Sequence, residues 1–257
     1  MAVDGIGAAV RRKEDFRFLT GRGNYTDDLA RPNQTHVYIV RSQVAHAKLG
    51  KIDAAKALKA PGVIAVFTGA DLAADGIGGL PCGWGIKNKD GSAMQEPGHP
   101  VLAQGKVRHV GDPIAAVIAE TLAQAKDAAE LLKIELSDLP AVAHVADAAK
   151  AGAPAVHDGG NLCFDWHIGD ADAVAAAFKK AHKVAKIDLV NNRLVANAME
   201  PRAAVGEFDR ATGEYTLFTT SQNPHVIRLL MGAFVLHIPE SRLRVFAPDV
   251  GGGFGSK

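Results

Sequence analysis

The stretch PIAAVIAETLAQAKDAAELLKIEL, residues 113–136, decides the fold class of this chain. Its opening part, Pro113–Ala119, is almost wholly apolar, as in a strand that is buried on both faces. Thr121 then stands where the N-cap of a helix is expected, and residues 122–132 place leucines and alanines on one helical stripe. Residues 133–136 resemble a further strand. Strands and a helix in such close succession indicate a mixed α/β or α+β architecture.

Outward from this stretch, strand-like and helix-like patterns alternate along the chain. Further strands are predicted at residues 36–42, Val63–Thr68, 182–191, Ala204–Asp209, Glu214–Thr219 and Leu243–Phe246. Further helices are predicted at residues 53–58, at residues 171–181 behind the cap Asp170, and at residues 224–236. Residues 74–111 are rich in glycine and proline and predict a long irregular excursion. A short turn ending in Gly213 predicts a hairpin.

Glycine and proline also divide the chain into three parts. Residues 1–140 are predicted to form a first domain, residues 141–161 a connector, and residues 162–257 the beginning of a second domain. A chain of 257 residues is long enough for two ordinary domains, each with its own core. The boundaries follow local composition alone.

The composition excludes several classes of protein. Apolar residues make up 47% and charged residues 22%, which is typical of soluble globular proteins, and a net charge of +1 gives no electrostatic basis for a nucleic-acid partner. No apolar run approaches the roughly 18 residues of a membrane span. In the opening sequence the basic residues follow the apolar ones, which is the wrong order for a secretory signal. Cys82 and Cys163 lack a CxxC pattern, so we expect free thiols in the cytoplasm and no metal cluster.

The sequence DVGGGFGSK, residues 249–257, is the strongest candidate for a ligand-binding segment. Consecutive glycines let the backbone approach a ligand closely and offer bare N–H groups to anionic or oxo groups. The dinucleotide fingerprint needs a sixth-position glycine where Ser256 stands, and the phosphate-binding loop pattern needs a glycine directly before Lys257. A nucleotide site is therefore the weaker hypothesis. A flexible tail is the alternative when this segment is considered alone.

Five segments together resemble one enzyme family, the large subunits of xanthine dehydrogenase, aldehyde oxidase and aerobic carbon monoxide dehydrogenase. In chain order they are EDFRFLTGRGNYTDD (14–28), VRHVGDPIAAVIAET (107–121), AMEPRAAVGEFD (198–209), SQNPH (221–225) and DVGGGFGSK (249–257). The resemblance extends from about Val10 to Lys257, and its details are nearest to the carbon monoxide dehydrogenase branch. It implies a hammerhead-like α/β domain followed by the first part of a molybdopterin-binding domain.

The resemblance also assigns roles to particular residues. Gln222 stands where the family's glutamine hydrogen-bonds the apical oxygen ligand of molybdenum, as a neutral donor next to the metal rather than a direct metal ligand. Residues implied to line the pterin and the metal are Gly251, Gly252, Gly253, Phe254 and Gly255. The alternative for Gln222 is an N-cap or turn residue ahead of Pro224.

The implied chemistry is hydroxylation of carbon monoxide, an aldehyde or an N-heterocycle with water as the oxygen source. The implied cofactor is molybdenum-molybdopterin, in the cytosine dinucleotide form. Electrons would leave through [2Fe-2S] clusters to FAD, which the family carries on a small subunit and a medium subunit.

The main departure from the family is length, because the family's large subunit continues for several hundred residues beyond the glycine-rich segment. The missing part supplies the general-base glutamate. We interpret Glu200 and Glu207 as structural or pocket-lining residues instead. The chain could be a fragment, the product of a truncated gene, or one part of a subunit split between two polypeptides. We therefore expect part of an oxidoreductase that is inactive alone, and the rival hypothesis is a metal-free assembly module.

Overall fold

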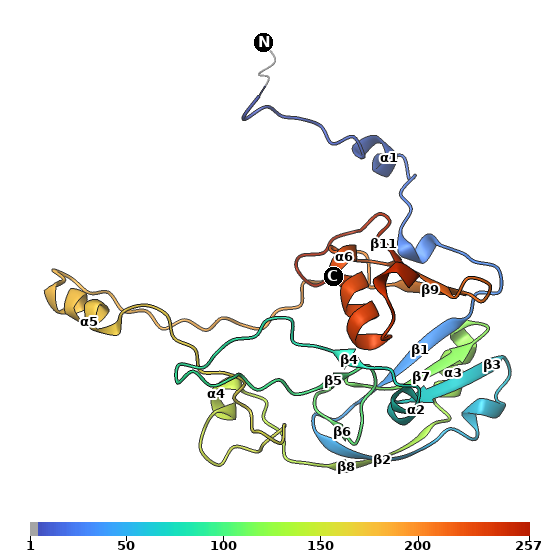
Figure 1. Ribbon diagram of the computed structural model, residues 1–257, viewed down its shortest axis with the longest axis horizontal. Helices are drawn as coiled ribbons and strands as arrows, with labels where there is room; N and C mark the ends of the chain where they lie inside the picture. The colour runs from blue at the N-terminus through green and yellow to red at the C-terminus, as the bar shows by residue number, and fades with distance from the viewer. Residues whose placement is uncertain (1–4) are drawn as a thin grey trace. The chain divides into compact units, whose positions relative to one another are not determined.

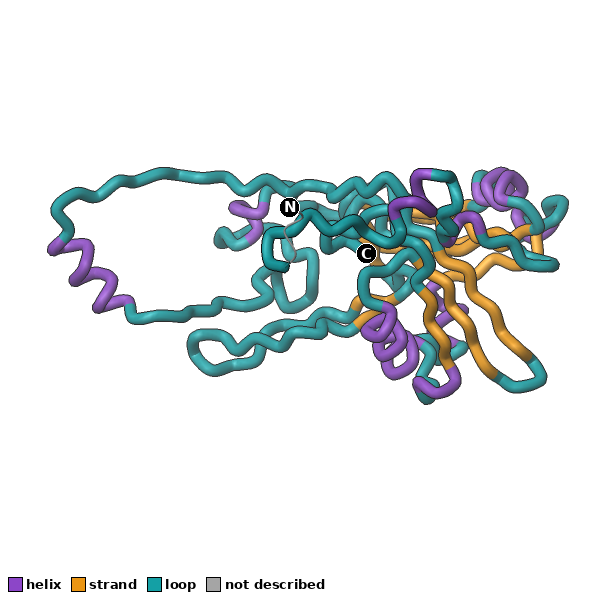
Figure 2. The backbone as a smooth tube through the Cα atoms, turned by 90° about the horizontal axis from the view of Figure 1, so that it is seen from above, coloured by secondary structure: helices purple, strands orange, loops and turns teal. Residues whose placement is uncertain are grey.

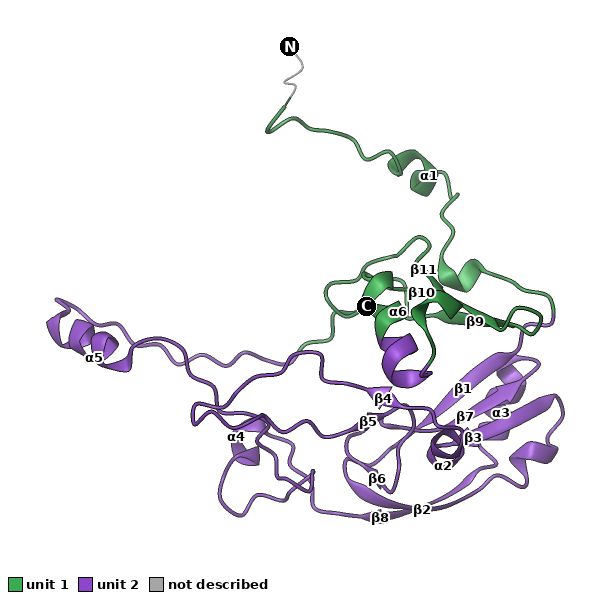
Figure 3. Ribbon diagram, viewed as in Figure 1, with its two compact units in different colours: residues 1–32, 194–229, 238–257 green, residues 33–193, 230–237 purple. Residues whose placement is uncertain are grey.

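The computed structural model describes residues 5–257, which form two compact units (Figure 3). The larger unit contains Asn33–Arg193 and Leu230–His237. The smaller unit contains the described chain up to Pro32 together with Leu194–Leu229 and Ile238–Lys257. The fold is mixed α/β. The domain boundaries predicted at residues 140 and 161 stay a prediction.

The first sheet of the larger unit is built around β7 (Pro113–Ala119), the apolar strand of the opening stretch (Figure 1). It lies between β1 (His36–Arg41) and β3 (Val63–Thr68) and pairs antiparallel with both. Helix α3 (Leu122–Ala129) packs on the sheet, and Thr121 caps it by accepting a hydrogen bond from the N–H of Gln124. The core shared by the sheet and α3 consists of side chains that are fully buried, which include Val117, Ala119, Ala125 and Ala128. Ile114 and Ala115 of β7 belong to a second buried cluster, with Ala47 and Val107.

A second sheet places β2 (Ala47–Asp53) between β6 (Lys106–Val107) and β8 (Lys133–Asp138). The predicted helix at residues 53–58 is wrong, because Asp53 ends β2 and only Ala57–Lys59 form a 3-10 helix. The pairing of β2 with β8 shifts register between Leu49 and Ile52. This irregularity breaks the alternation of apolar residues by which a strand is recognised in a sequence.

The rest of the larger unit is mostly irregular, as Figure 2 shows for the long teal segments. Its short elements are α2 (Gly69–Ala74), β4 (Gly79–Leu80), β5 (His99–Pro100), α4 (Val145–Ala148) and α5 (Ala171–Lys180). Asp170 caps α5 as predicted. The predicted strand at residues 182–191 is wrong, because no strand pairs with it and side chains such as Leu189 are exposed. Alternation alone does not form a strand when backbone groups find no partner.

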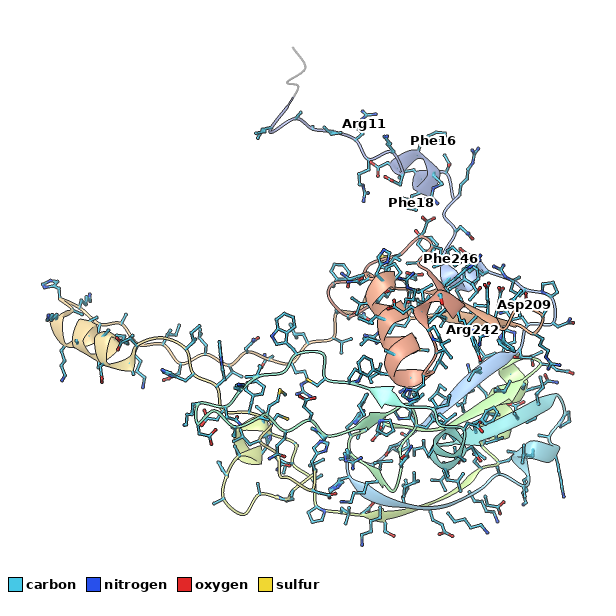
Figure 4. The ribbon with its side chains drawn as sticks, viewed as in Figure 1. Arg11, Phe16, Phe18, Asp209, Arg242 and Phe246 are labelled. Atoms are coloured by element: carbon cyan, nitrogen blue, oxygen red, sulfur yellow. The ribbon has the colours of Figure 1, made fainter. Side chains whose placement is uncertain are left out.

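The smaller unit contains a three-stranded sheet in the order β11-β10-β9. The predicted hairpin is confirmed as β9 (Ala204–Asp209) and β10 (Glu214–Thr219). Strand β11 (Leu243–Phe246) pairs parallel with β10, and Figure 4 shows Phe246 on β11 and Asp209 at the end of β9. The rings of Phe218 and Phe246 stack across the parallel pair with centroids 5.2 Å apart.

Two short helices complete the smaller unit, α1 (Asp15–Leu19) and α6 (Pro224–Leu230), together with the 3-10 helix Thr26–Asp28. The predicted helix at residues 224–236 is a regular α-helix only to Leu230. Met231–Val235 continue it as a π-helix, which belongs to the larger unit. None of the helices within residues 5–257 is long and apolar enough to cross a bilayer.

Candidate functional site

The pairing of the strands in the smaller unit brings the site residues to one edge of the sheet. Gln222 follows the carboxyl end of β10, and residues 251–255, here called the glycine loop, follow the carboxyl end of its parallel neighbour β11. Strand β9 runs antiparallel to β10, so Glu200 and Arg202 approach the same edge just before β9 begins. Open α/β sheets bind ligands at the carboxyl ends of their parallel strands. The topology therefore brings segments far apart in the sequence to the edge at which such a sheet is expected to bind a ligand.

Gln222 contacts the glycine loop directly. The backbone N–H of Gly255 donates a hydrogen bond to Oε1 of Gln222 over 2.8 Å, and the backbone N–H of Gln222 donates to the carbonyl of Lys257 over 3.3 Å. Because Oε1 must face the N–H of Gly255, the NH₂ group of Gln222 is left as a donor. In the described chain this NH₂ group has no hydrogen-bond partner.

The alternative role for Gln222, a helix cap, belongs to its neighbour. Oδ1 of Asn223 accepts a hydrogen bond from the backbone N–H of Val226 over 3.2 Å, which is the capping contact of α6. The hydroxyl of Ser221 in turn accepts from the N–H of Asn223 over 3.0 Å. The side chain of Gln222 is thus free of a capping role and points to the glycine loop.

Gly253 must be a glycine for the loop to pass Gln222. A Cβ atom at this position would lie 2.3 Å from Cδ of Gln222, which is far below any van der Waals contact. Gly252 has a φ of 106° and Phe254 a φ of 51°, so the loop turns sharply through the left-handed region on either side of Gly253. The ring of Phe254 is 75% exposed at this turn. The close approach fixes the loop against the amide of Gln222.

The middle of the glycine loop presents unpaired donors. Among residues 5–257, the backbone N–H groups of Gly252, Gly253 and Phe254 find no hydrogen-bond acceptor. Successive N–H groups in a glycine-rich turn form a concave site for anions. Together with the NH₂ group of Gln222, they give this edge a set of donors that suits an anionic or oxygen-rich group.

A buried ion pair holds the two ends of the glycine loop together. Oε2 of Glu200 accepts from the N–H of Gly251 over 2.6 Å and lies 3.2 Å from Nζ of Lys257. Nζ of Lys257 also donates to the backbone carbonyl of Glu200 over 2.6 Å. The side chains of Glu200 and Lys257 are only 9% and 2% exposed. Their position indicates that they anchor the loop rather than exchange protons with a substrate.

Arg202 and Arg17 add two further anchors. Nη2 of Arg202 donates to the carbonyl of Ser256 over 2.6 Å. Arg17 forms a two-pronged ion pair with Asp249, in which Nη2 lies 2.7 Å from Oδ1 and Nη1 binds Oδ2. The hydrogen bond from Arg17 lowers the pKa of Asp249, against the opposing effect of burial. Both arginines lie in segments that carry the family resemblance, but the sequence alone assigned them no role, because their partners Asp249 and Ser256 are distant in the sequence.

The other acidic candidate, Glu207, lies away from the loop, in the hairpin strand β9, where it forms an ion pair with Arg31. Within residues 5–257, no three His, Cys, Asp or Glu side chains are gathered in a way that could hold a metal ion. Cys82 and Cys163 are both free and exposed. The site residues therefore offer hydrogen-bond donors rather than metal ligands.

Fold and site together define an α/β protein that presents a glycine loop and an amide donor at the edge of a parallel strand pair. Comparison with known proteins makes this more specific. Residues 20–140 match the family described as "Aldehyde oxidase and xanthine dehydrogenase, a/b hammerhead domain". Residues 156–257 match the family described as "Molybdopterin cofactor-binding domain".

Individual proteins give the same result. The chain is 35% identical to the carbon monoxide dehydrogenase large chain of Afipia carboxidovorans, over 99% of this chain and 32% of the relative. It is 34% identical to the nicotine 6-hydroxylase large subunit of Paenarthrobacter nicotinovorans, over 98% and 30%. The crystal structure of quinoline 2-oxidoreductase from Pseudomonas putida 86 superimposes with a TM-score of 0.81 at 36% identity, over 95% of this chain and 30% of that one.

The chain belongs to the family of xanthine dehydrogenase, aldehyde oxidase and carbon monoxide dehydrogenase large subunits. It comprises the hammerhead domain and the start of the molybdopterin-binding domain, and it spans about a third of the length of these relatives.

Proposed function

We propose that this chain forms the first section of the large subunit of a molybdenum hydroxylase, and that Gln222 and the glycine loop contact the molybdenum end of molybdopterin. The observation that carries this proposal is the contact between Gln222 and Gly255. It occupies Oε1 of the amide and turns the NH₂ group into a fixed donor next to the unpaired N–H groups of the loop. A neutral donor can orient an oxo group without adding charge to the site.

The residues present fit such a group. Molybdopterin is an anionic, oxygen-rich ligand, and the N–H groups of Gly252, Gly253 and Phe254 supply donors without intruding side chains. When bound, the cofactor supplies a two-electron oxidation in which water provides the oxygen atom. Gln222 orients the group and the loop binds it.

We propose that the general base for proton transfer lies outside this chain. Glu200 and Lys257 are buried and paired with each other, so neither is placed to accept a proton from a substrate. Glu207 is paired with Arg31 in the hairpin sheet. We therefore place the general-base glutamate in the remaining part of the large subunit, and we expect the chain to be inactive alone.

Substrate and partners follow from the same family assignment. The relatives include a carbon monoxide dehydrogenase and a nicotine hydroxylase, so we propose carbon monoxide, an aldehyde or an N-heterocycle as the substrate class. We further propose the cytosine dinucleotide form of the cofactor, and as partners the rest of the large subunit, an FAD-binding medium subunit and a [2Fe-2S] small subunit. The proposed location is the cytoplasm, where two free, exposed thiols stay reduced.

The test is to purify the chain from its natural host under mild conditions, with whatever binds to it. Molybdenum is quantified by elemental mass spectrometry, and flavin and iron–sulfur clusters are measured by absorption. The proposal predicts molybdenum in an amount near that of the chain, together with polypeptides that carry flavin and clusters. A colourless chain without molybdenum would contradict the proposal and support the rival hypothesis of a metal-free assembly module.

A further inference from the structure

We propose that Arg17 is a positioning residue for the glycine loop, which it holds in place through Asp249. This assigns a role to the opening segment EDFRFLTGRGNYTDD, residues 14–28, for which the proposed cofactor contacts give none. All the residues concerned belong to the smaller unit. The inference rests on the proposed function only where it concerns the bound cofactor.

The contacts between this segment and Asp249 are numerous for one residue. The two terminal guanidinium nitrogens of Arg17 bind the two carboxylate oxygens of Asp249, and Nη2 lies 2.7 Å from Oδ1. The N–H of Asn24 donates to Oδ2 of Asp249 over 2.7 Å, and the N–H of Asp249 donates to the carbonyl of Asn24 over 3.1 Å. Tyr25 and Asp249 form a parallel bridge. A two-pronged arginine–carboxylate pair fixes orientation as well as distance.

Asp249 stands two residues before the glycine loop, so its position sets where the loop begins. The backbone N–H groups of Gly252, Gly253 and Phe254 find no acceptor in the described chain, and glycine backbone is intrinsically free to move. The loop is therefore held by its ends. Glu200 holds Gly251 and Gln222 holds Gly255, while Arg17 holds Asp249 in the segment between β11 and the loop.

Arg17 matters for the position of Asp249 because the carboxylate of Asp249 has little access to water. The side chain of Asp249 is only 14% exposed, so removal of Arg17 leaves a mostly buried carboxylate with a single backbone donor, Asn24. Such a carboxylate tends to turn towards water. That movement would displace residues 250–251 and loosen the loop, although Arg17 forms no hydrogen bond to the loop itself within the described residues.

The experiment compares hydrogen–deuterium exchange of peptides covering residues 247–257 in the purified complex and in variants of it. Arg17→Ala should make exchange in these peptides about fivefold to tenfold faster, because charge-assisted hydrogen bonds are lost. Peptides from β7 and α3 should not change. Molybdenum per chain, measured on the same samples, should fall in parallel.

Arg12→Ala is the matched control. Arg12 lies in the same segment and also forms an ion pair, with Asp15 at 2.9 Å, but it has no contact with Asp249. It should leave loop exchange and molybdenum content at the wild-type values. Arg17→Lys keeps the charge but not the two-pronged geometry, so it should restore only part of the protection.

Asp249→Asn removes the charge of the other partner and preserves the shape of the side chain. This variant can be tested if Arg17→Ala does not fold. The double variant should exchange no faster than the faster single variant, because both remove one interaction. Equal loop exchange in Arg17→Ala, Asp249→Asn and Arg12→Ala would overturn the inference. Faster loop exchange in Arg17→Ala than in wild type, in a complex whose wild-type form contains no molybdenum, would instead leave the positioning role intact and contradict the proposed function.

Discussion

The core of the larger unit and the glycine loop of the smaller unit are held in opposite ways. The core of the larger unit consists of two clusters of apolar side chains, one around Ile114 and one around Val117, and both of these residues are at most 1% exposed. In the smaller unit, Leu243 is the only hydrophobic residue among those described that is buried to a similar degree. The loop depends on Glu200, Gln222 and Arg17 instead. Burial stabilises the first region, and directed polar contacts define the second.

The largest expected effect is a loss of stability in the apolar core of the larger unit. Ile114→Ala removes a side chain that is 1% exposed at the centre of the three-stranded sheet, and should lower the free energy of unfolding by about 3 kcal/mol. Ile64→Ala on β3 is the control, because that side chain is 56% exposed. Denaturant titration followed by circular dichroism measures both. Equal losses of unfolding free energy in the two variants would contradict the assignment of Ile114 to the hydrophobic core.

The next effect targets the polar region without touching the core. Gly253→Ala inserts a methyl group 2.3 Å from Cδ of Gln222 and should displace the amide from Gly255. Molybdenum per chain in the purified complex should fall by about tenfold or more, since positioned donors in such sites contribute on the order of 1.5–3 kcal/mol. Unfolding of the larger unit should stay unchanged.

Gly206→Ala is the control for this variant, because a Cβ atom at Gly206 in β9 would meet nothing within 4 Å. Full molybdenum content in Gly253→Ala would mean that the contact between Gln222 and the loop plays no part in holding the cofactor.

A smaller loss of stability is expected at the N-terminus of α3, which packs on the apolar core. Thr121→Ala removes the cap of α3, whose hydroxyl accepts from the N–H of Gln124, and should lower the free energy of unfolding by about 1 kcal/mol. Thr121→Ser keeps the hydroxyl and should recover most of the loss. Thermal unfolding of both variants gives the answer, and an alanine variant as stable as the serine variant would refute the capping role.

The smallest expected effect depends on pH. The hydrogen bond from Arg17 holds the pKa of Asp249 below its usual value, so the ionised carboxylate stabilises the loop at neutral pH and this contribution disappears as the pH falls through the lowered pKa. In Arg17→Gln the main cause of the shift is gone, the pKa of Asp249 rises, and loosening should begin at a higher pH. Arg12→Gln should behave as wild type.

Limited proteolysis of residues 247–257, in steps from neutral pH to about pH 3, would follow this change. Identical pH profiles for Arg17→Gln and wild type would contradict the role given to the pair.

The two regions also differ in how far the sequence predicts them. Pro113–Ala119 and the cap Thr121 were predicted residue by residue, because apolar runs and caps are local signals. Strand β2 was missed, since its irregular pairing between Leu49 and Ile52 breaks the alternation. Residues 182–191 alternate well but form no strand in the described chain, because a strand also needs a partner.

The candidate site shows the same division. Gln222 and residues 251–255 were identified by resemblance, and the structure brings them into contact. Arg17 was not identified, because its partner Asp249 lies 232 positions away in the sequence. Lys257 and Glu200 likewise meet only because β9 begins and β11 ends at the same edge of a sheet. Contacts that depend on topology leave no local trace in the sequence.

The most direct test of the central claim is an experimental structure of the chain purified with its natural partners. The account predicts molybdopterin against residues 251–255, with the NH₂ group of Gln222 donating a hydrogen bond to the bound cofactor. A metal site elsewhere, or a Gln222 amide turned away from the cofactor while Gly255 loses its acceptor, would contradict the account.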